Sequence, residues 1–300
     1  MNINAIFSGV WAIQESALAF YVEWLKRVGD NAVPLFGDGE RTELMQELQA
    51  AVGHAANRQG SVAIVPIHGP ISQKSSLFQR FMGGTSTEGI EANVASAVND
   101  PNVKAVVLDI DSPGGSVYGV EQAGDTIRSL RGRKPIVAIA NSLAASAAYW
   151  IGAQADEFYA SPGAEVGSVG VFAMHMDVSG MLEKEGVKVS FIKAGKYKTD
   201  GNPYEPLSDD ARADAQASVD RYHADFVKAL AAGRGVPPST VRDKFGDGKV
   251  FGGEDAKARG MIDRVGTMSE LLGRLGAAVP GQRRKADMMR RRLELRKATG

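Results

Sequence analysis

Residues 104–110 of the sequence read KAVVLDI, and residues 111–116 read DSPGGS directly after them. The first segment is a short apolar run, rich in β-branched residues and bounded by turn-forming ones, which is typical of a buried strand in a parallel sheet. Two similar runs occur nearby, VAIVPI at residues 62–67 and PIVAIA at residues 135–140. These three segments predict the central strands of one sheet.

Helical patterns at Thr87–Val98 and Val117–Arg131 separate these strands. Alternation of strand and helix predicts right-handed βαβ units, so the expected fold class is α/β with a βαβ-built sheet. Further strands are expected at Glu157–Ala160, Gly167–Ala173 and Val187–Ile192, and further helices at Ser179–Glu185, Ser208–Ala232 and Gly253–Arg259.

The segments on either side of this body differ from it. Residues 1–60 are expected to form a helical N-terminal extension, with an amphipathic helix between Ile6 and Leu25 that packs on the body or on a neighbouring subunit, and a linker at Gly53–Gly60. Residues 61–266 form the predicted α/β domain. Residues 267–300 are expected to be a helical, basic tail.

The net charge of zero conceals an uneven distribution. After Pro280 the tail holds eight basic residues and two acidic ones, so it carries +6 and the remainder of the chain carries −6. From its charge alone the tail is interpreted as an ordinary solvated helix. Nucleic-acid binding is not expected, because no aromatic residues are interspersed with the basic ones.

Composition excludes several classes of protein. The chain has no cysteine, which excludes disulfides and thiolate chemistry, and its four histidines lie far apart in no metal-ligand spacing. No phosphate-binding loop or dinucleotide fingerprint occurs, so no cofactor is expected. The apolar stretch from Ile6 to Leu25 is interrupted by charged residues and lacks a signal-peptide pattern, so a cytoplasmic protein with no membrane partner is expected.

Two strand-to-helix loops carry unusual chemistry. The glycine pair in Asp111–Ser116 lets backbone N–H groups approach a phosphate, a carboxylate or an oxyanion. The loop NSLAASAAY at Asn141–Tyr149 is rich in small residues, which leave the hydroxyl of Ser146 open to a bound chain at a helix start. Taken singly, each loop is more often a close-packed turn than a site.

A nucleophilic serine needs a base, and the residue types alone leave two kinds open. One is a histidine, with His175 the candidate and His68 more readily explained as a packed residue. The other is a neutral lysine whose pKa is lowered by its surroundings. Three lysines follow one predicted strand closely, and their spacing does not select one: Lys193, Lys196 and Lys198.

Four ordered motifs together resemble the signal peptide peptidase A family of serine proteases. They are SPGGSV at residues 112–117, SLAAS at 142–146, GSVGV at 167–171 and KAGKYK at 193–198, and the similarity covers about residues 61–266. The run KTDGNPY at residues 198–204 looks closest to the phage branch, the prohead or capsid maturation proteases.

The resemblance implies a crotonase or caseinolytic-protease type of fold that assembles into rings or domes. It also implies a Ser–Lys dyad, with Ser146 as nucleophile, Lys198 as general base and Ser168 orienting the lysine amine. The oxyanion hole would comprise the N–H of Ala147 and that of Gly114 or Gly115. Many relatives have two glycines after the nucleophile, where this chain has Ala147-Ala148, and any requirement for positive φ there would be compromised.

The function implied is that of a serine endopeptidase which matures phage heads. The same resemblance implies that the basic tail is an assembly or capsid-binding arm, or a processed remnant. Its partners would be capsid, scaffold or portal proteins and further copies of itself, in the host cytoplasm, with no cofactor. A substrate strand is expected to lie beside Gly114–Val117, with a small or modest apolar residue before the cleaved bond. The alternatives are a host-type peptidase of the same family, a crotonase-type hydratase or isomerase, and a non-catalytic assembly protein.

Overall fold

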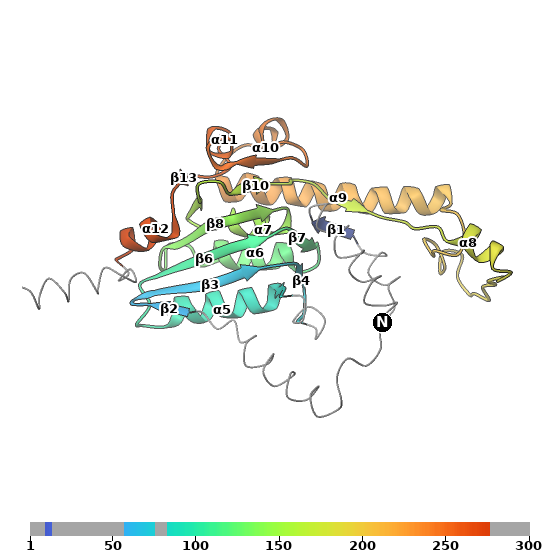
Figure 1. The fold of residues 1–300 in the computed structure, drawn as a ribbon, viewed down its shortest axis with the longest axis horizontal. Helices are drawn as coiled ribbons and strands as arrows, with labels where there is room; N and C mark the ends of the chain where they lie inside the picture. Colours follow the sequence, from blue (N-terminus) through green and yellow to red (C-terminus); the bar gives the residue numbers. More distant parts are fainter. Residues whose placement is uncertain (1–9, 14–56, 76–82, 277–300) are drawn as a thin grey trace, which may run out of the picture.

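A computed structural model describes residues 10–13, 57–75 and 83–276 of the chain (Figure 1). The chain folds around a main sheet of eight strands in the order β12-β10-β8-β6-β3-β2; β9 also pairs with β8, and β13 pairs with β9. The bounds of these strands are β2 Asn57–Gln59, β3 Val62–His68, β6 Ala105–Ser112, β8 Ile136–Ala145, β9 Glu157–Ala160, β10 Glu165–Gly167, β12 Val250–Gly252 and β13 Arg264–Val265.

The centre of the main sheet is parallel, as the three apolar runs predict. β3 pairs with β6 along its whole length, and β6 pairs with β8 from Val106 opposite Ile136 to Ser112 opposite Ala144. The ten-residue β8 is shared between two neighbours, because its first half pairs with β9 and its last three residues pair with β10. The carboxyl ends of β6, β8 and β10 therefore lie side by side.

Helices cover one face of this sheet and bury the larger core. They are α5 (Thr87–Asn99), α6 (Val120–Ser129), α7 (Ala147–Gly152) and the C-terminal part of α9 (Asp209–Arg234). The other face buries a smaller cluster under α12 (Met268–Arg274). Serine side chains cap two of these helices: Ser86 and Ser208 each accept a backbone N–H of the first turn of α5 and α9 respectively.

A second sheet of five short strands lies at the carboxyl end of the main one. Its order is β11-β1-β7-β4-β5. The strands are β1 Val10–Ile13, β4 Ile71–Ser72, β5 Thr85–Ser86, β7 Gly114–Ser116 and β11 Phe172–Ala173. β7 is the glycine-rich loop that follows β6, so the chain passes directly from a central strand of the main sheet into this small sheet.

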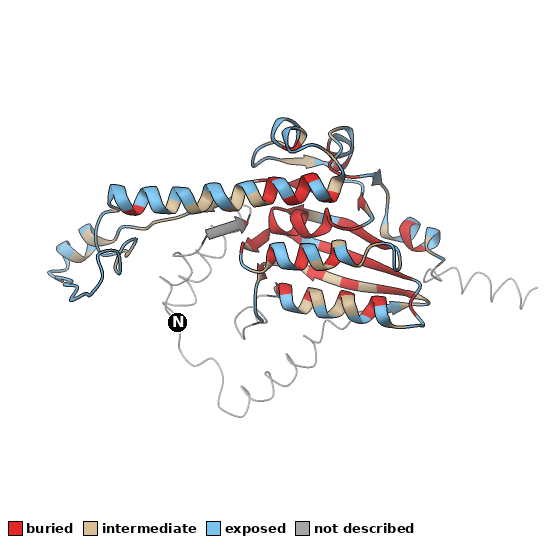
Figure 2. Ribbon diagram, turned by 180° about the vertical axis from the view of Figure 1, so that it is seen from behind, coloured by how far each residue is buried: buried red, intermediate tan, exposed pale blue. Residues whose placement is uncertain are grey.

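An arm projects from the body, formed by residues 174–208, which include α8 (Ser179–Lys184), and by the first half of α9 (Figures 1 and 2). The buried residues of α9 lie mainly beyond Phe226, whereas nearly all of its earlier residues are exposed or half-buried. The arm carries most of the large apolar side chains that the described residues expose: Met181, Val187, Val189, Phe191, Ile192, Tyr197 and Tyr204.

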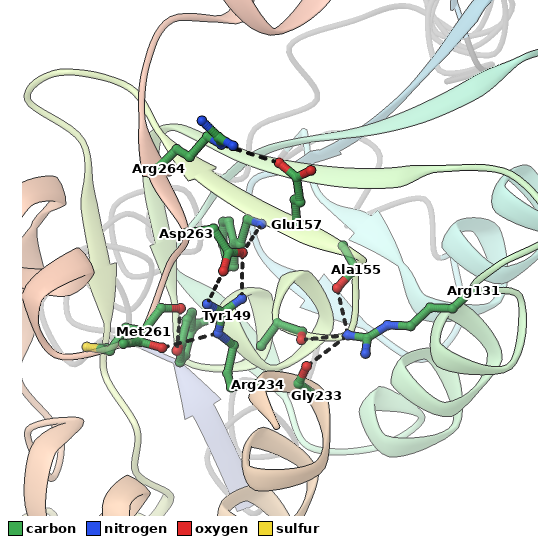
Figure 3. A network of polar contacts seen from close by, with 12 residues as sticks. Arg131, Tyr149, Ala155, Glu157, Gly233, Arg234, Met261, Asp263 and Arg264 are labelled. Atoms are coloured by element: carbon green, nitrogen blue, oxygen red, sulfur yellow. Dashed lines mark hydrogen bonds and ion pairs between the residues drawn. The ribbon is translucent and has the colours of Figure 1, made fainter. Parts of the chain in front are cut away.

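A buried polar network fastens α7 to the rest of the body (Figure 3). The Tyr149 hydroxyl, on α7, donates to the carbonyl of Met261 at 2.9 Å, and burial raises the pKa of this phenol. Arg234, at the end of α9, makes two hydrogen bonds of 2.8 and 2.9 Å to Asp263. Arg131 donates to four backbone carbonyls at the C-terminal ends of α7 and α9, including that of Gly233 at 2.9 Å. α7 is thereby held at both ends.

The predicted strands and helices of the body are largely confirmed. The predicted strand at Gly167–Ala173 proves to be two short strands, β10 and β11, because the chain turns away from the main sheet after Gly167. The predicted strand at Val187–Ile192 is wrong: this segment lies on the arm without a strand partner among the described residues, and its side chains are exposed. The helix expected to begin at the Asn141–Tyr149 loop is α7, whereas the short helix α10 (Pro238–Lys244) was not anticipated.

The predictions for the segments on either side of the body, residues 1–60 and 267–300, are tested only in part. Val10–Ile13 is a strand, which contradicts a continuous helix from Ile6 to Leu25, and Asn57–Gln59 is a strand inside the predicted linker. The remainder of residues 1–56 lies outside the described residues, as does the basic tail at residues 281–300. Within the part of the chain that the structure describes, no helix is long and apolar enough to span a bilayer.

Candidate active site

Ser146 lies at the junction of β8 and α7, in a backbone conformation that is unusual for a residue with a side chain. Its φ is 55° and its ψ −119°, and only two other described residues besides glycine have positive φ. Its N–H donates to the carbonyl of Gly167 at 2.7 Å, and its carbonyl accepts the N–H of Trp150 at 2.9 Å. A strained serine held at a strand-to-helix turn is characteristic of nucleophiles that must project from a sheet edge.

Ser146 is fully buried, and among the described residues its hydroxyl lies at hydrogen-bond distance from one carbonyl. Its Oγ donates to the carbonyl of Gly170 at 3.5 Å, which is a long and weak contact. The small residues on either side, Ala144, Ala145 and Ala147, are also completely buried. Larger side chains would not fit, which explains the Ala/Ser composition of the loop.

The two alanines after Ser146 take ordinary helical positions. Ala147 and Ala148 begin α7, and neither has positive φ. The replacement of the glycines found in many relatives therefore costs no backbone strain here. The first N–H groups of a helix have no partner within it, so the N–H of Ala147 is oriented as a donor beside Ser146.

The glycine loop lies next to this serine, as the carboxyl ends of adjacent parallel strands require. Ser112 is opposite Ala144, two residues before Ser146. The N–H of Gly114, which has φ 95°, donates to the Ser112 hydroxyl at 3.2 Å, and that hydroxyl donates to the carbonyl of Gly69 at 2.6 Å. A Cβ on Gly115 would lie 1.8 Å from the carbonyl oxygen of Ile71, so only glycine allows β7 and β4 to pack this closely.

Ser168 is also brought to the site. It follows Gly167, which pairs with Ala145, so it lies directly beside the nucleophile. It has φ 55°, is almost completely buried, and donates its N–H to the carbonyl of Lys249 at 2.7 Å. The structure thus brings together Ser146, Ser168, the glycine loop and the start of α7.

Lys198 is not brought to this place within one chain. It is exposed on the arm and lines a cleft of about 320 Å³ with Met174, His175 and Phe191, of which Ser146 is not part. Figure 1 shows this part of the arm at the far end of α9 from α7. Within the described residues, the Lys198 amine makes no hydrogen bond or ion pair.

The two other candidate lysines are held by local partners. Lys193 donates to the hydroxyl of Thr199 at 2.8 Å. Lys196 contacts the Tyr197 hydroxyl and Asp210, and these hydrogen bonds raise its pKa, which opposes the neutral form that a general base needs.

Neither candidate histidine lies beside Ser146. His175 lines the arm cleft, and its Nε2 is buried with no hydrogen-bond partner among the described residues. His68 ends β3 with its Nε2 3.5 Å from a carboxylate oxygen of Asp109, and a hydrogen bond to that carboxylate raises the pKa of the imidazole. Neither His175 nor His68 is therefore placed to act as the base of Ser146 within one chain.

Three participants were not anticipated from the sequence. The carbonyl of Gly170 contacts the Ser146 hydroxyl, and the hydroxyl of Ser112 accepts the N–H of Gly114 in the glycine loop. Both residues belong to the recognised motifs, but the sequence did not indicate these contacts. Ile13 lines a cleft of about 370 Å³ with Ser168 and Gly170. No sequence signal connected Ile13 to the site, because the glycine loop and Ser146 lie about 100 or more positions further along the chain.

Comparison with known proteins agrees with the motifs. The sequence profile of peptidase family S49 matches residues 128–279, just over half of the chain, a range that includes Ser146, Ser168 and Lys198. The capsid assembly protease C of Escherichia phage lambda is 33% identical over 204 residues, 68% of this chain and 46% of the phage protein. A putative protease of Methanocaldococcus jannaschii is 38% identical over 176 residues, 59% of this chain and 56% of its own.

The chain spans about half the length of these curated relatives. Among solved structures, a ClpP1 variant from Listeria monocytogenes superposes with a TM-score of 0.41 at 15% identity, over 69% of this chain and 92% of its own.

Proposed function

Because the chain belongs to peptidase family S49, we propose that it is a serine endopeptidase whose nucleophile is Ser146. The membership confirms the family resemblance drawn from the four motifs, and the lambda relative fits its phage branch. The observation that carries the proposal is the conformation of Ser146, a buried, strained residue between a parallel strand and a helix, with helix N–H groups and a glycine loop beside it.

Lys198 of a neighbouring copy is the proposed base. Within one chain the amine lies on the arm, away from Ser146, while Ser168, the residue expected to orient it, lies beside the nucleophile. An arm that reached the Ser146 site of the next subunit would complete each dyad at an interface. The apolar side chains of the arm support such an assembly, because an exposed apolar patch of this kind usually marks a protein interface.

The proposed chemistry is acyl transfer to serine followed by hydrolysis. The neutral Lys198 amine takes the proton of Ser146 Oγ, and Oγ attacks the carbonyl carbon of the substrate. The N–H of Ala147 and that of Gly114 or Gly115 donate to the developing oxyanion. For Gly114 this means sharing or giving up its bond of 3.2 Å to Ser112. The protonated lysine then donates its extra proton to the leaving amine as the peptide C–N bond breaks. In the second half, the neutral lysine takes a proton from water, the hydroxide attacks the acyl-enzyme, and the proton returns to Ser146 Oγ as the acid product leaves.

The proposed substrates are the proteins of an assembling phage head: capsid, scaffold or portal proteins, processed in the host cytoplasm. The similarity to a phage protein named as a capsid assembly protease supports this choice over a host-type peptidase. Mass spectrometry of candidate head proteins incubated with wild type and Ser146→Ala would test it. Identical products from both proteins would favour a non-catalytic assembly role.

The shared dyad is tested by mixing two inactive variants. Ser146→Ala retains Lys198, and Lys198→Ala retains Ser146, so a co-assembled mixture contains some interfaces at which an intact serine meets an intact lysine. In a ring with one kind of contact between neighbours, random mixing restores about a quarter of the wild-type sites. Ser146→Ala mixed with a Ser146→Ala/Lys198→Ala variant is the matched control and stays inactive. If the first mixture is equally inactive, the base does not come from a neighbour.

A further inference from the structure

The strand β1 occupies the place beside the site where an extended peptide would bind. It pairs with β7 on one side and with β11 on the other, antiparallel to both. β7 is the glycine loop, and β11 begins two residues after Gly170, whose carbonyl contacts Ser146 Oγ. β1 is thus the middle strand between two segments that flank the nucleophile.

The rest of the fold does not need this strand. Residues 14–56 separate β1 from β2, and β1 pairs with no strand of the main sheet. Without it, the facing edges of β7 and β11 would be open along a groove one strand wide. Open edges of this kind take up extended peptides through main-chain hydrogen bonds.

The register of β1 directs its C-terminal end toward the nucleophile. Trp11 lies opposite Ser116, Ala12 opposite Gly115 and Ile13 opposite Gly114. Ile13 is 4% exposed and lines the same cleft as Ser168 and Gly170. A substrate bound in this direction would place its residue before the cleaved bond at the position of Ile13.

We propose that Val10–Ile13 is a built-in, substrate-like ligand of the groove between β7 and β11, and that it must leave before another peptide can bind. The complete burial of Ser146 in the presence of this strand agrees with an occupied site. The groove accepts an extended apolar segment with an aliphatic residue at the position of Ile13. This inference rests on the proposed function for the location of the site, but it concerns peptide binding and does not require cleavage.

The test uses the full chain carrying Ser146→Ala, so that binding is measured without turnover. The probe is a fluorescent peptide with the chain's own residues 8–16, SGVWAIQES, followed by fluorescence polarisation. Adding Trp11→Pro and Ile13→Pro removes backbone N–H groups and disfavours pairing of β1. The matched control, Trp11→Phe with Ile13→Leu, keeps both N–H groups and similar side chains.

The proline variant is expected to bind the peptide about tenfold more tightly than the control. A tethered segment acts at an effective concentration on the order of 1 mM. If β1 and the free peptide each bind the open groove with a Kd of about 0.1 mM, the ratio of these two concentrations, about ten, is the factor by which β1 weakens peptide binding. Equal affinity of the proline variant, the control and the parent would overturn the inference.

Hydrogen exchange on the parent chain gives a second readout that needs no proline variant. Saturating peptide should reduce the amide protection of residues 10–13 and leave that of β3 and β6 unchanged. If peptide binds while residues 10–13 keep their protection, β1 does not compete for the groove. Because both measurements are made without a nucleophile, a failure of peptidase activity in the wild type would leave their outcome unaffected.

Discussion

The backbone strain at Ser146 leads to a quantitative prediction about stability. A residue with a side chain at φ 55° and ψ −119° costs about 1–3 kcal/mol, and glycine at that position removes most of this cost. Glycine also adds roughly 0.5–1 kcal/mol of unfolded-state entropy and loses the burial of one methyl group, worth about 0.8 kcal/mol. We therefore expect Ser146→Gly to be as stable as Ser146→Ala or more stable by about 1 kcal/mol.

The neighbouring residue provides the matched control. Ala145 is equally buried but does not have positive φ, so Ala145→Gly loses the same methyl group and the same entropy with no relief of strain. It should destabilise the fold by about 1.5 kcal/mol. Going from alanine to glycine at position 146 (Ser146→Ala against Ser146→Gly) and at position 145 should therefore change the free energy of unfolding by amounts that differ by about 2 kcal/mol. Urea denaturation followed by tryptophan fluorescence measures this difference, since Trp150 is buried in the core. Equal costs at the two positions would refute strain at the nucleophile.

Three further predictions concern the supports of the site. Gly115→Ala places a methyl group against the carbonyl of Ile71, so we expect a loss of about 1–3 kcal/mol in denaturation and a loss of peptide cleavage; unchanged stability would contradict this close packing. Tyr149→Phe leaves the carbonyl of Met261 without its donor and should cost about 1–2 kcal/mol in the same assay, with Tyr159→Phe, on the other face of the sheet, as a comparison. For Asp263, burial alone would raise the pKa, but the hydrogen bonds and charge of Arg234 outweigh it and lower the pKa. The ion pair therefore stabilises the fold above the ordinary carboxyl pKa and is lost as the pH falls through the lowered value. Asp263→Asn should cost about 2 kcal/mol at neutral pH, less than the loss of a fully buried pair, because the carboxylate is 37% exposed. It should also weaken the fall in the free energy of unfolding toward acid pH; an unchanged fall would exclude this role for the ion pair.

The central strands and the site at their carboxyl ends could be predicted because local pattern and tertiary environment agree there. The apolar runs before Asp111 and Asn141 are buried on both faces, and parallel pairing necessarily brings their ends together. The positions of Ser146, Ser168 and the glycine loop follow from that topology.

The arm and the N-terminal strand could not be predicted for a different physical reason. Val187–Ile192 has the composition of a strand, but a strand also needs a partner with free edge groups, and the described residues place none beside it. Val10–Ile13 forms a strand because β7 and β11 offer two edges, although the surrounding pattern favours a helix. Long-range pairing decided both cases, and no local pattern records it.

The central claim is that Ser146 is a nucleophile activated by Lys198, and covalent labelling tests it most directly. Wild-type protein treated with a fluorophosphonate probe and analysed by peptide mass spectrometry should carry the adduct on Ser146. Lys198→Ala should label far more slowly, while Lys193→Ala, which removes a neighbouring amine held by Thr199, should label at the wild-type rate. An adduct on another serine, or labelling of Ser146 that is unaffected by Lys198→Ala, would contradict the account.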